Sequence, residues 1–216
     1  MMLARIVDTV ERGLAEFYGF APLSTESAHL VTRDELRASL GGAVESLPEY
    51  RARAGVFLVE QTPDTFIGIH FDESLRATLE ARDPTRELSD ANLDAFCILV
   101  EEVSHFHLLL NRLAPGRGVS KLELETQGEI DKLLVCALLL GHQAGDQHLV
   151  PLARRLYDTA VITGEDKELY WQATRHAARF WFEAIRREAR LGPRLRESLR
   201  QIYAASWAEK QAKLVA

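Results

Sequence analysis

Apolar residues recur along most of the chain at the three-to-four-residue spacing of amphipathic helices. Near the start, Ile6, Val10, Leu14 and Phe17 keep this spacing, which predicts a helix that Gly19 and Pro22 terminate. Capping residues, glycines and prolines delimit further helices downstream. The helices expected in this way cover residues 3–20, 32–40, 72–83, 89–113, 120–140, 148–160, 166–190 and 193–216.

The spacing changes in one part of the chain. The segments "GVFLVEQ" and "TFIGIHF" are short and rich in β-branched and aromatic residues, and "TPD" between them has turn chemistry. They predict a β-hairpin that pairs residues 56–61 with 65–71. The expected fold class is therefore mainly α with a small hairpin or sheet of two or three strands, an α+β arrangement.

The domain organisation can be predicted from the composition and from the short connections between the expected helices. With 47% hydrophobic and 27% charged residues and no low-complexity linker, the chain has the composition of a single globular domain over residues 1–216. Its expected parts are N-terminal helices at 1–54, a hairpin with a helix pair at 55–140, and a C-terminal helical part at 148–216.

The compartment and the cysteines can be judged from their surroundings. Asp8, Glu11 and Glu16 interrupt the first apolar face, and no later run approaches the roughly 20 apolar residues of a membrane span. We expect a cytoplasmic protein without a membrane segment. Cys97 and Cys136 each lie in an apolar helical stretch without CxxC spacing, which favours buried free thiols over a disulfide or metal ligation.

Charge is unevenly distributed, although the net value is only -6. Acidic residues are in excess before residue 150 and basic residues after it. Three glutamates interleave with the C-terminal arginines, so intrahelical pairs weaken the field and nucleic acid is not the favoured partner. We interpret residues 166–190 as a core helix with a basic outer surface, the alternative being a surface that faces a protein partner or nucleic acid. The glutamates are Glu183, Glu188 and Glu197.

Candidate chemistry lies in the otherwise apolar stretch "CILVEEVSHFHLLL", residues 97–110. Glu101 and Glu102 stand four and three residues before His105, so all three can share one side of a helix, whereas His107 points elsewhere. A carboxylate buried there needs a metal cation, a basic side chain or hydrogen bonds.

The next helix adds two more carboxylates. Glu125 and Glu129 lie four residues apart, and the short connection predicts antiparallel packing, which brings either one opposite Glu101 and His105. Three oxygen or nitrogen ligands with an open position suit zinc, and carboxylate-rich sets also suit iron or manganese. The alternative is a structural network in which Glu101 bonds His105, Lys132 neutralises Glu129, and Glu125 is solvated.

The order of these motifs resembles minimal zinc metallopeptidases of the ImmA/IrrE kind, which are gluzincins. The resemblance covers residues 55–140 through "TFIGIHFDES", "EEVSH" and "EIDKLLVCALLL". It implies that His105 is the second histidine ligand, Glu129 the third ligand, and Glu102 the general base that activates water. Glu101 occupies the first histidine position of the family motif, which implies a changed metal site or an inactive descendant.

Two functional hypotheses follow. The first is a metal-dependent hydrolase of metallopeptidase type, or its inactive metal-binding descendant, which binds zinc, or else iron or manganese, and acts on a peptide or protein. The second is a non-enzymatic interaction or regulatory module, in which the Glu/His network is structural and the C-terminal helices contact a protein partner. A homo-oligomer is compatible with both.

Overall fold

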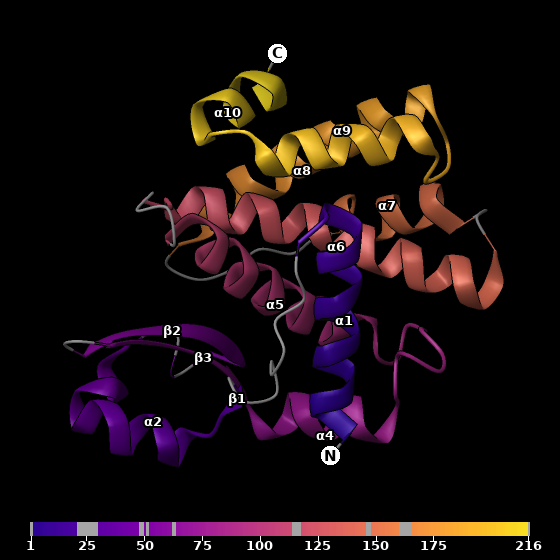
Figure 1. Ribbon diagram of the computed structural model, residues 1–216. Helices are drawn as coiled ribbons and strands as arrows, with labels where there is room; N and C mark the ends of the chain where they lie inside the picture. Colours follow the sequence, from indigo (N-terminus) through magenta and orange to yellow (C-terminus); the bar gives the residue numbers. More distant parts are fainter. Residues whose placement is uncertain are drawn as a thin grey trace.

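The computed structural model describes residues 2–20, 30–47, 50, 52–61, 64–113, 118–145, 148–159 and 166–215. Within these residues the fold is mainly helical with a small three-stranded sheet, which confirms the expected fold class (Figure 1). The helices are α1 Met2–Tyr18, α2 Arg33–Leu40, the 3-10 helix η2 Gly41–Ser46, α4 Glu73–Ala81, α5 Leu93–Leu113, α6 Lys121–Ala144, α7 Leu149–Tyr157, α8 Lys167–Arg187, α9 Pro193–Ala204 and α10 Trp207–Val215.

The sheet contains the predicted hairpin and one further strand. Strands β2 Ala54–Gln61 and β3 Asp64–Phe71 pair antiparallel, and β1 Leu30–Val31 pairs parallel to β3, giving the order β1-β3-β2. The tip of the predicted turn, residues 62–63, lies outside the described residues. A two-residue strand leaves no periodic signal, which is why β1 was not located from the sequence. Helix α5 packs on β2 and β3.

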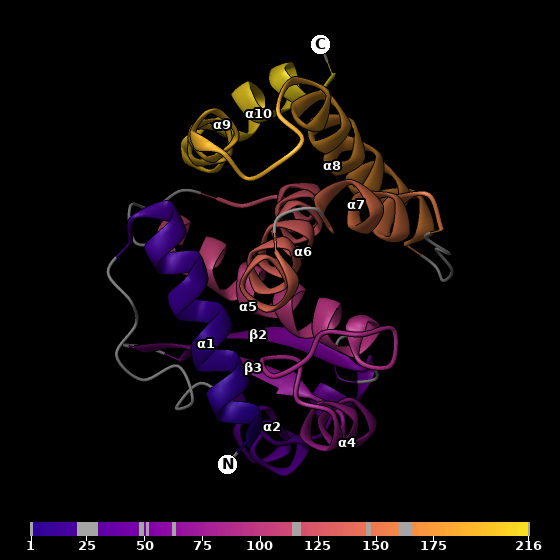
Figure 2. The same cartoon turned by 90° about the vertical axis from the view of Figure 1, so that its right-hand side faces the viewer.

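Helices α5 and α6 form the centre of the molecule. They pack closely, and the facing pairs Cys97–Cys136 and Ser104–Asp131 show that they run antiparallel, as predicted. The sheet and α2 lie on one side of this pair, and α9 and α10 lie on the opposite side (Figure 2). Helix α1 packs across α5 and α6 and buries its predicted apolar face against them. No helix in the described ranges is long and apolar enough to cross a membrane.

Several helix boundaries differ from the sequence prediction. Helix α5 begins at Leu93 and not near Ser89, because the buried Asn92 side chain accepts from Ser89 N and donates to the Arg82 and Glu87 carbonyls, which fixes a turn before the helix. Helix α6 continues through Ala144 into the residues predicted as a loop.

The predicted last helix is in fact two. Ser206 caps α10: its hydroxyl accepts from Glu209 N, and the Glu209 carboxylate accepts from Ser206 N at 2.8 Å. Ala205 before it has extended backbone, so the chain turns between α9 and α10. The four-residue pattern S-W-A-E is a capping box, and it is the sequence signal for this second helix start.

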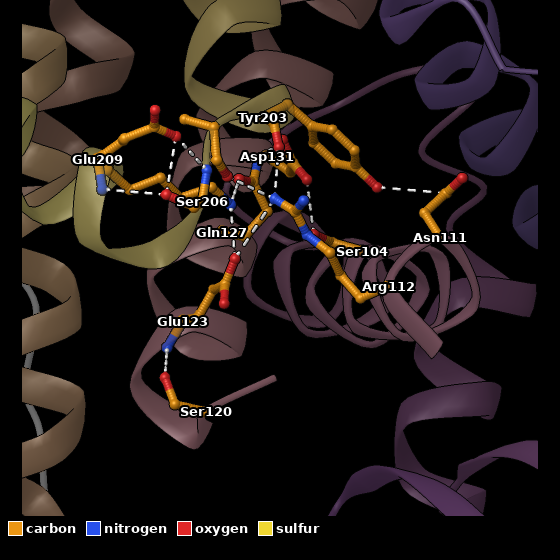
Figure 3. A network of polar contacts seen from close by, with 12 residues as sticks. Ser104, Asn111, Arg112, Ser120, Glu123, Gln127, Asp131, Tyr203, Ser206 and Glu209 are labelled. Atoms are coloured by element: carbon orange, nitrogen blue, oxygen red, sulfur yellow. Dashed lines mark hydrogen bonds and ion pairs between the residues drawn. The ribbon is translucent and has the colours of Figure 1, made fainter. Parts of the chain in front are cut away.

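A buried polar network attaches these two C-terminal helices to α5 and α6 (Figure 3). Lys210 of α10 is 1% exposed, and its ammonium donates to Gln127 Oε1 at 3.1 Å and lies 3.2 Å from the Glu123 carboxylate. Arg112 of α5 donates to the carbonyls of Tyr203 and Ala205, at 3.0 and 2.6 Å. These bonds satisfy carbonyls at the end of α9, so the network fixes where the C-terminal helices sit.

Asp131 joins three helices at the centre of the same network. Its carboxylate accepts from Tyr18 of α1 at 2.5 Å, from Ser104 of α5 at 2.6 Å and from Gln127 of α6 at 3.0 Å. Burial raises the pKa of Asp131 to about 6 even though these three donors favour the ionised form.

The raised pKa predicts a pH-dependent contribution to stability. Because folded Asp131 binds its proton more tightly than an unfolded aspartate near 3.8, it stabilises the fold fully below pH of about 4 and loses that contribution as pH rises through about 6, on the order of 3 kcal/mol. In Asp131→Asn the amide keeps the partners and does not titrate. Urea unfolding at pH 4.5 to 7 should therefore show wild type gaining stability relative to Asp131→Asn as pH falls. A constant difference between the two proteins would contradict the prediction.

Candidate metal centre

Three of the five candidate residues come together between α5 and α6. Glu101 and His105 of α5 and Glu125 of α6 each offer one ligand atom, and these atoms all lie within 4.8 Å of one another. His105 Nε2 lies 3.6 Å from Glu125 Oε2. We call these three residues the triad. An arrangement of two carboxylates and one imidazole at this separation can hold a divalent metal ion.

The triad contains buried polar atoms that nothing in the described part of the chain satisfies. His105 is 8% exposed and Glu125 6% exposed. Neither His105 Nε2 nor Glu125 Oε2 has a hydrogen-bond partner there, and the two atoms face each other. Leaving such groups unpaired costs about 1 to 3 kcal/mol each. A ligand placed between them would remove this cost. The burial of Glu125 also contradicts the expectation, in the structural alternative, that it is solvated.

The other imidazole nitrogen of His105 is oriented by Glu102. Its Nδ1 lies 3.7 Å from Glu102 Oε2, on the opposite edge of the ring from Nε2. Histidines that bind metals commonly present their second nitrogen to a carboxylate, which fixes the ring orientation and makes the ligand more basic. Glu102 therefore lies where it can hold His105 with Nε2 directed at Glu125.

Glu129 lies outside the triad. Lys132 donates to Glu129 Oε1 at 2.8 Å and to Glu101 Oε2 at 3.1 Å, and Thr174 of α8 donates to Glu129 Oε1 at 3.1 Å. The resemblance implied Glu129 as the third ligand, but the structure places Glu125, one helical turn earlier, beside His105. Lys132 neutralises Glu129 as the structural alternative expected, and it also contacts the triad through Glu101.

The pKa values of the triad residues depend on burial and on the charged groups packed around them. Burial lowers the pKa of His105, but Glu102, Glu125 and Glu101 outweigh it and raise the value to about 9. Burial, with the charge of Glu101, raises the pKa of Glu125, whereas Lys132 and His105 overcome burial and lower the pKa of Glu101. Without a metal ion, protons on His105 and Glu125 reduce the repulsion. A divalent cation would compete with these protons for the same atoms.

Gly128 makes the close approach of the two helices possible. A Cβ atom at this position of α6 would lie 3.0 Å from His105 Nε2 and 3.1 Å from Glu101 Cγ. A side chain there would require the imidazole and the carboxylate to shift from their positions by a few tenths of an ångström. A glycine inside a predicted helix was the available sequence signal, because it carries a helix-propensity cost that only packing or function justifies.

Other polar residues near the helix pair are placed differently. His107 lies away from the triad, as expected, with its Nε2 3.0 Å from Glu11 Oε1 of α1. His70 is buried in the sheet, and its Nδ1 lies 3.2 Å from the Val31 carbonyl. Tyr170 of α8 was not singled out from the sequence, yet burial and then the nearby Glu125 and Glu101 carboxylates raise its pKa. Helix α8 therefore brings Tyr170 within electrostatic range of two of the triad carboxylates.

No family model, curated protein or solved structure matches the chain. The resemblance to minimal zinc metallopeptidases therefore rests on short motifs alone. What the structure contributes is a mainly helical fold with a buried Glu/His/Glu triad that could bind a metal ion.

The position of Gly128 yields a prediction with a matched control. Alanine in place of glycine inside a helix ordinarily stabilises a protein by about 1 kcal/mol. At Gly128 the added methyl group would crowd His105 and Glu101, so Gly128→Ala should lose this gain and weaken metal binding about tenfold or more. Urea unfolding and titration against a coloured chelator measure both effects.

Gly13 of α1 provides the control, because a Cβ there would meet no described atom within 4 Å. Gly13→Ala should raise stability by up to about 1 kcal/mol and leave metal affinity unchanged. If Gly128→Ala behaved in the same way, the close contact at Gly128 would have no bearing on the triad.

Proposed function

We propose that this protein binds one divalent metal ion through Glu101, His105 and Glu125. The observation that carries the proposal is the pair of buried, facing atoms, His105 Nε2 and Glu125 Oε2, that lack partners in the described part of the chain. A metal ion between them would satisfy both atoms, and the Glu101 carboxylate would complete a three-ligand set.

The charge balance around the triad supports a cation. Four carboxylates, two from each central helix, lie beside His105 or Lys132, and Lys132 is bonded to only two of them, Glu101 and Glu129. Two of these carboxylates are already bonded to Lys132, which leaves Glu102 and Glu125 to share His105. A divalent ion would offset this excess negative charge without requiring Glu125 to stay protonated.

The donor set narrows the choice of metal. Zinc accepts imidazole nitrogen together with carboxylate oxygen, and three protein ligands leave one position open. Iron and manganese also accept carboxylate-rich sets. We propose zinc as the first metal to test, with iron and manganese next.

Hydrolysis of a peptide or amide bond is the activity class that we propose for the loaded site. The ion would supply Lewis acidity. Glu102 would orient His105, Lys132 would hold Glu101, and Tyr170 would lie near the two carboxylate ligands. Because Glu102 faces His105 Nδ1, we propose that it positions the ligand and is not the general base that the resemblance implies. The substrate in this proposal is a peptide or a protein.

A structural network is the second candidate, because Lys132 already bonds both Glu101 and Glu129. In that case the chain would act as an interaction module through its C-terminal helices. Trp171 of α8 supports this candidate, since it is 48% exposed and carries the Arg175 guanidinium 4.5 Å from its ring centroid. Such an exposed aromatic and arginine pair is typical of protein contact surfaces.

Metal content tests the proposal directly. Elemental analysis of protein purified without chelators or metal-affinity columns should find about one equivalent of zinc, iron or manganese per chain, as a single three-ligand site requires. His105→Ala should remove it, because the only nitrogen ligand is lost. His142→Ala is the matched control, since His142 is exposed near the end of α6 and its loss should leave the metal in place.

Circular dichroism shows whether His105→Ala still folds, and Glu125→Gln offers a nearly isosteric second variant that should also lose metal. If wild type holds no metal even after incubation with each ion, or if His105→Ala retains it, the triad is a structural network and the interaction module becomes the better hypothesis.

A separate prediction concerns whether Glu102 positions His105 or acts as the general base. If Glu102 positions His105, Glu102→Gln should weaken metal affinity by about tenfold, within the range found when such outer carboxylates are removed. Competition with a coloured chelator measures the affinity. An unchanged affinity combined with loss of peptide hydrolysis would instead identify Glu102 as the general base.

A further inference from the structure

Two thiols face each other across the central helix pair, one helical turn from Glu101 of the triad. Cys97 of α5 and Cys136 of α6 are free and buried, as the sequence predicted, and their sulfur atoms lie 3.9 Å apart. A disulfide bond is about 2.0 Å long, so the sulfurs must approach by roughly another 2 Å. Each sulfur turns about its own Cα–Cβ bond, so rotation of the two side chains is the movement that the bond would require.

Access to the pair is asymmetric. Cys97 is 8% exposed and lines a cavity of about 410 Å³ together with Glu129, Lys132 and Thr174, whereas Cys136 is fully buried. A small oxidant that enters this cavity meets Cys97 first. Contact with Cys97 and burial raise the pKa of the Cys136 thiol well above its usual range, which makes it a poor nucleophile toward an external oxidant. Its burial and its position 3.9 Å from Cys97 Sγ leave Cys97 as its neighbouring reaction partner.

We propose that Cys97 and Cys136 are a peroxide-sensitive pair that forms a reversible disulfide between α5 and α6. Neither thiol is a ligand in the triad, and the proposal does not depend on a bound metal. The bond would lie one helical turn from the Lys132 and Glu101 contact, because Cys97 precedes Glu101 by four residues and Cys136 follows Lys132 by four.

The chemistry balances with a hydroperoxide as the oxidant. The Cys97 sulfur attacks one peroxide oxygen, the O–O bond breaks, and the leaving oxygen takes the thiol proton as water or alcohol, which leaves a sulfenic acid at Cys97. The Cys136 sulfur then attacks Cys97 Sγ, the S–O bond breaks, and the departing hydroxide takes the Cys136 proton as water. Two electrons pass from the thiols to the peroxide, and a dithiol reductant returns them.

The disulfide would change the stability of the protein against unfolding. It would join residues 39 positions apart across the packed interface that carries the triad, and a cross-link of this kind restricts the unfolded chain. Oxidation should therefore raise the midpoint of urea unfolding. Reduction should return it to the starting value.

The test uses the full chain, reduced, freed of reductant and treated with hydrogen peroxide in parallel with and without a chelator. Alkylation under denaturing conditions and mass spectrometry should show loss of both reactive thiols, loss of two hydrogens per chain, and a linked peptide that contains Cys97 and Cys136. Dithiothreitol should restore both thiols. The chelator should make no difference, which separates this result from the metal proposal.

Variants identify the order of events. In Cys136→Ser, peroxide should leave a sulfenic acid at Cys97 that dimedone traps, and in Cys97→Ser the remaining thiol should stay reduced under the same exposure. The wild-type linked peptide decides the question even if a variant folds poorly. The proposal is overturned if wild type keeps both thiols, if Cys97 proceeds directly to sulfinic acid, or if the linkage joins two chains.

Discussion

The interaction on which the centre of this molecule depends is the pairing of Lys132 with Glu101 and Glu129. Carboxylates inside an apolar helix pair are tolerated only when a positive charge or several donors accompany them. Lys132 supplies that charge from α6 to one carboxylate on each helix, at 3.1 and 2.8 Å. Its ammonium therefore does more than neutralise charge: it fixes which turn of α5 faces which turn of α6.

That register explains the order of features along the pair. Successive turns bring Cys97 opposite Cys136, then Glu101 opposite Lys132, then His105 opposite Gly128, and nearby Ser104 opposite Asp131. The thiols, the triad and the network that holds the C-terminal helices are consequences of one helix packing. A slip of one residue would rotate all of them away from their partners, because side chains at adjacent helical positions point about 100° apart.

Much of this could be predicted from the sequence, and the failures have physical causes. Periodicity and capping located the hairpin and most helices. Glu101 and His105 became candidates because they are polar residues in the otherwise apolar segment 97–110. Choosing between Glu125 and Glu129 was not achievable, because both lie on one side of α6 and the choice depends on the register that Lys132 and Gly128 set. From α8, Thr174 bonds Glu129 and Tyr170 lies near the charges of Glu125 and Glu101. Sequence spacing carries no information about such contacts between distant elements.

The composition of the triad bears on what kind of metal chemistry it can support. Each anionic ligand reduces the effective charge of a bound ion and so weakens its polarising effect on water or a carbonyl group. Here Glu101 stands where the resembling peptidases have a neutral histidine, and Glu102 adds further negative charge beside His105 Nδ1. The same carboxylates strengthen the attraction for a cation. A metal ion held by this ligand set would therefore be bound more effectively than it would activate water. For that reason the proposed function is metal binding, and the proposed hydrolysis depends on it.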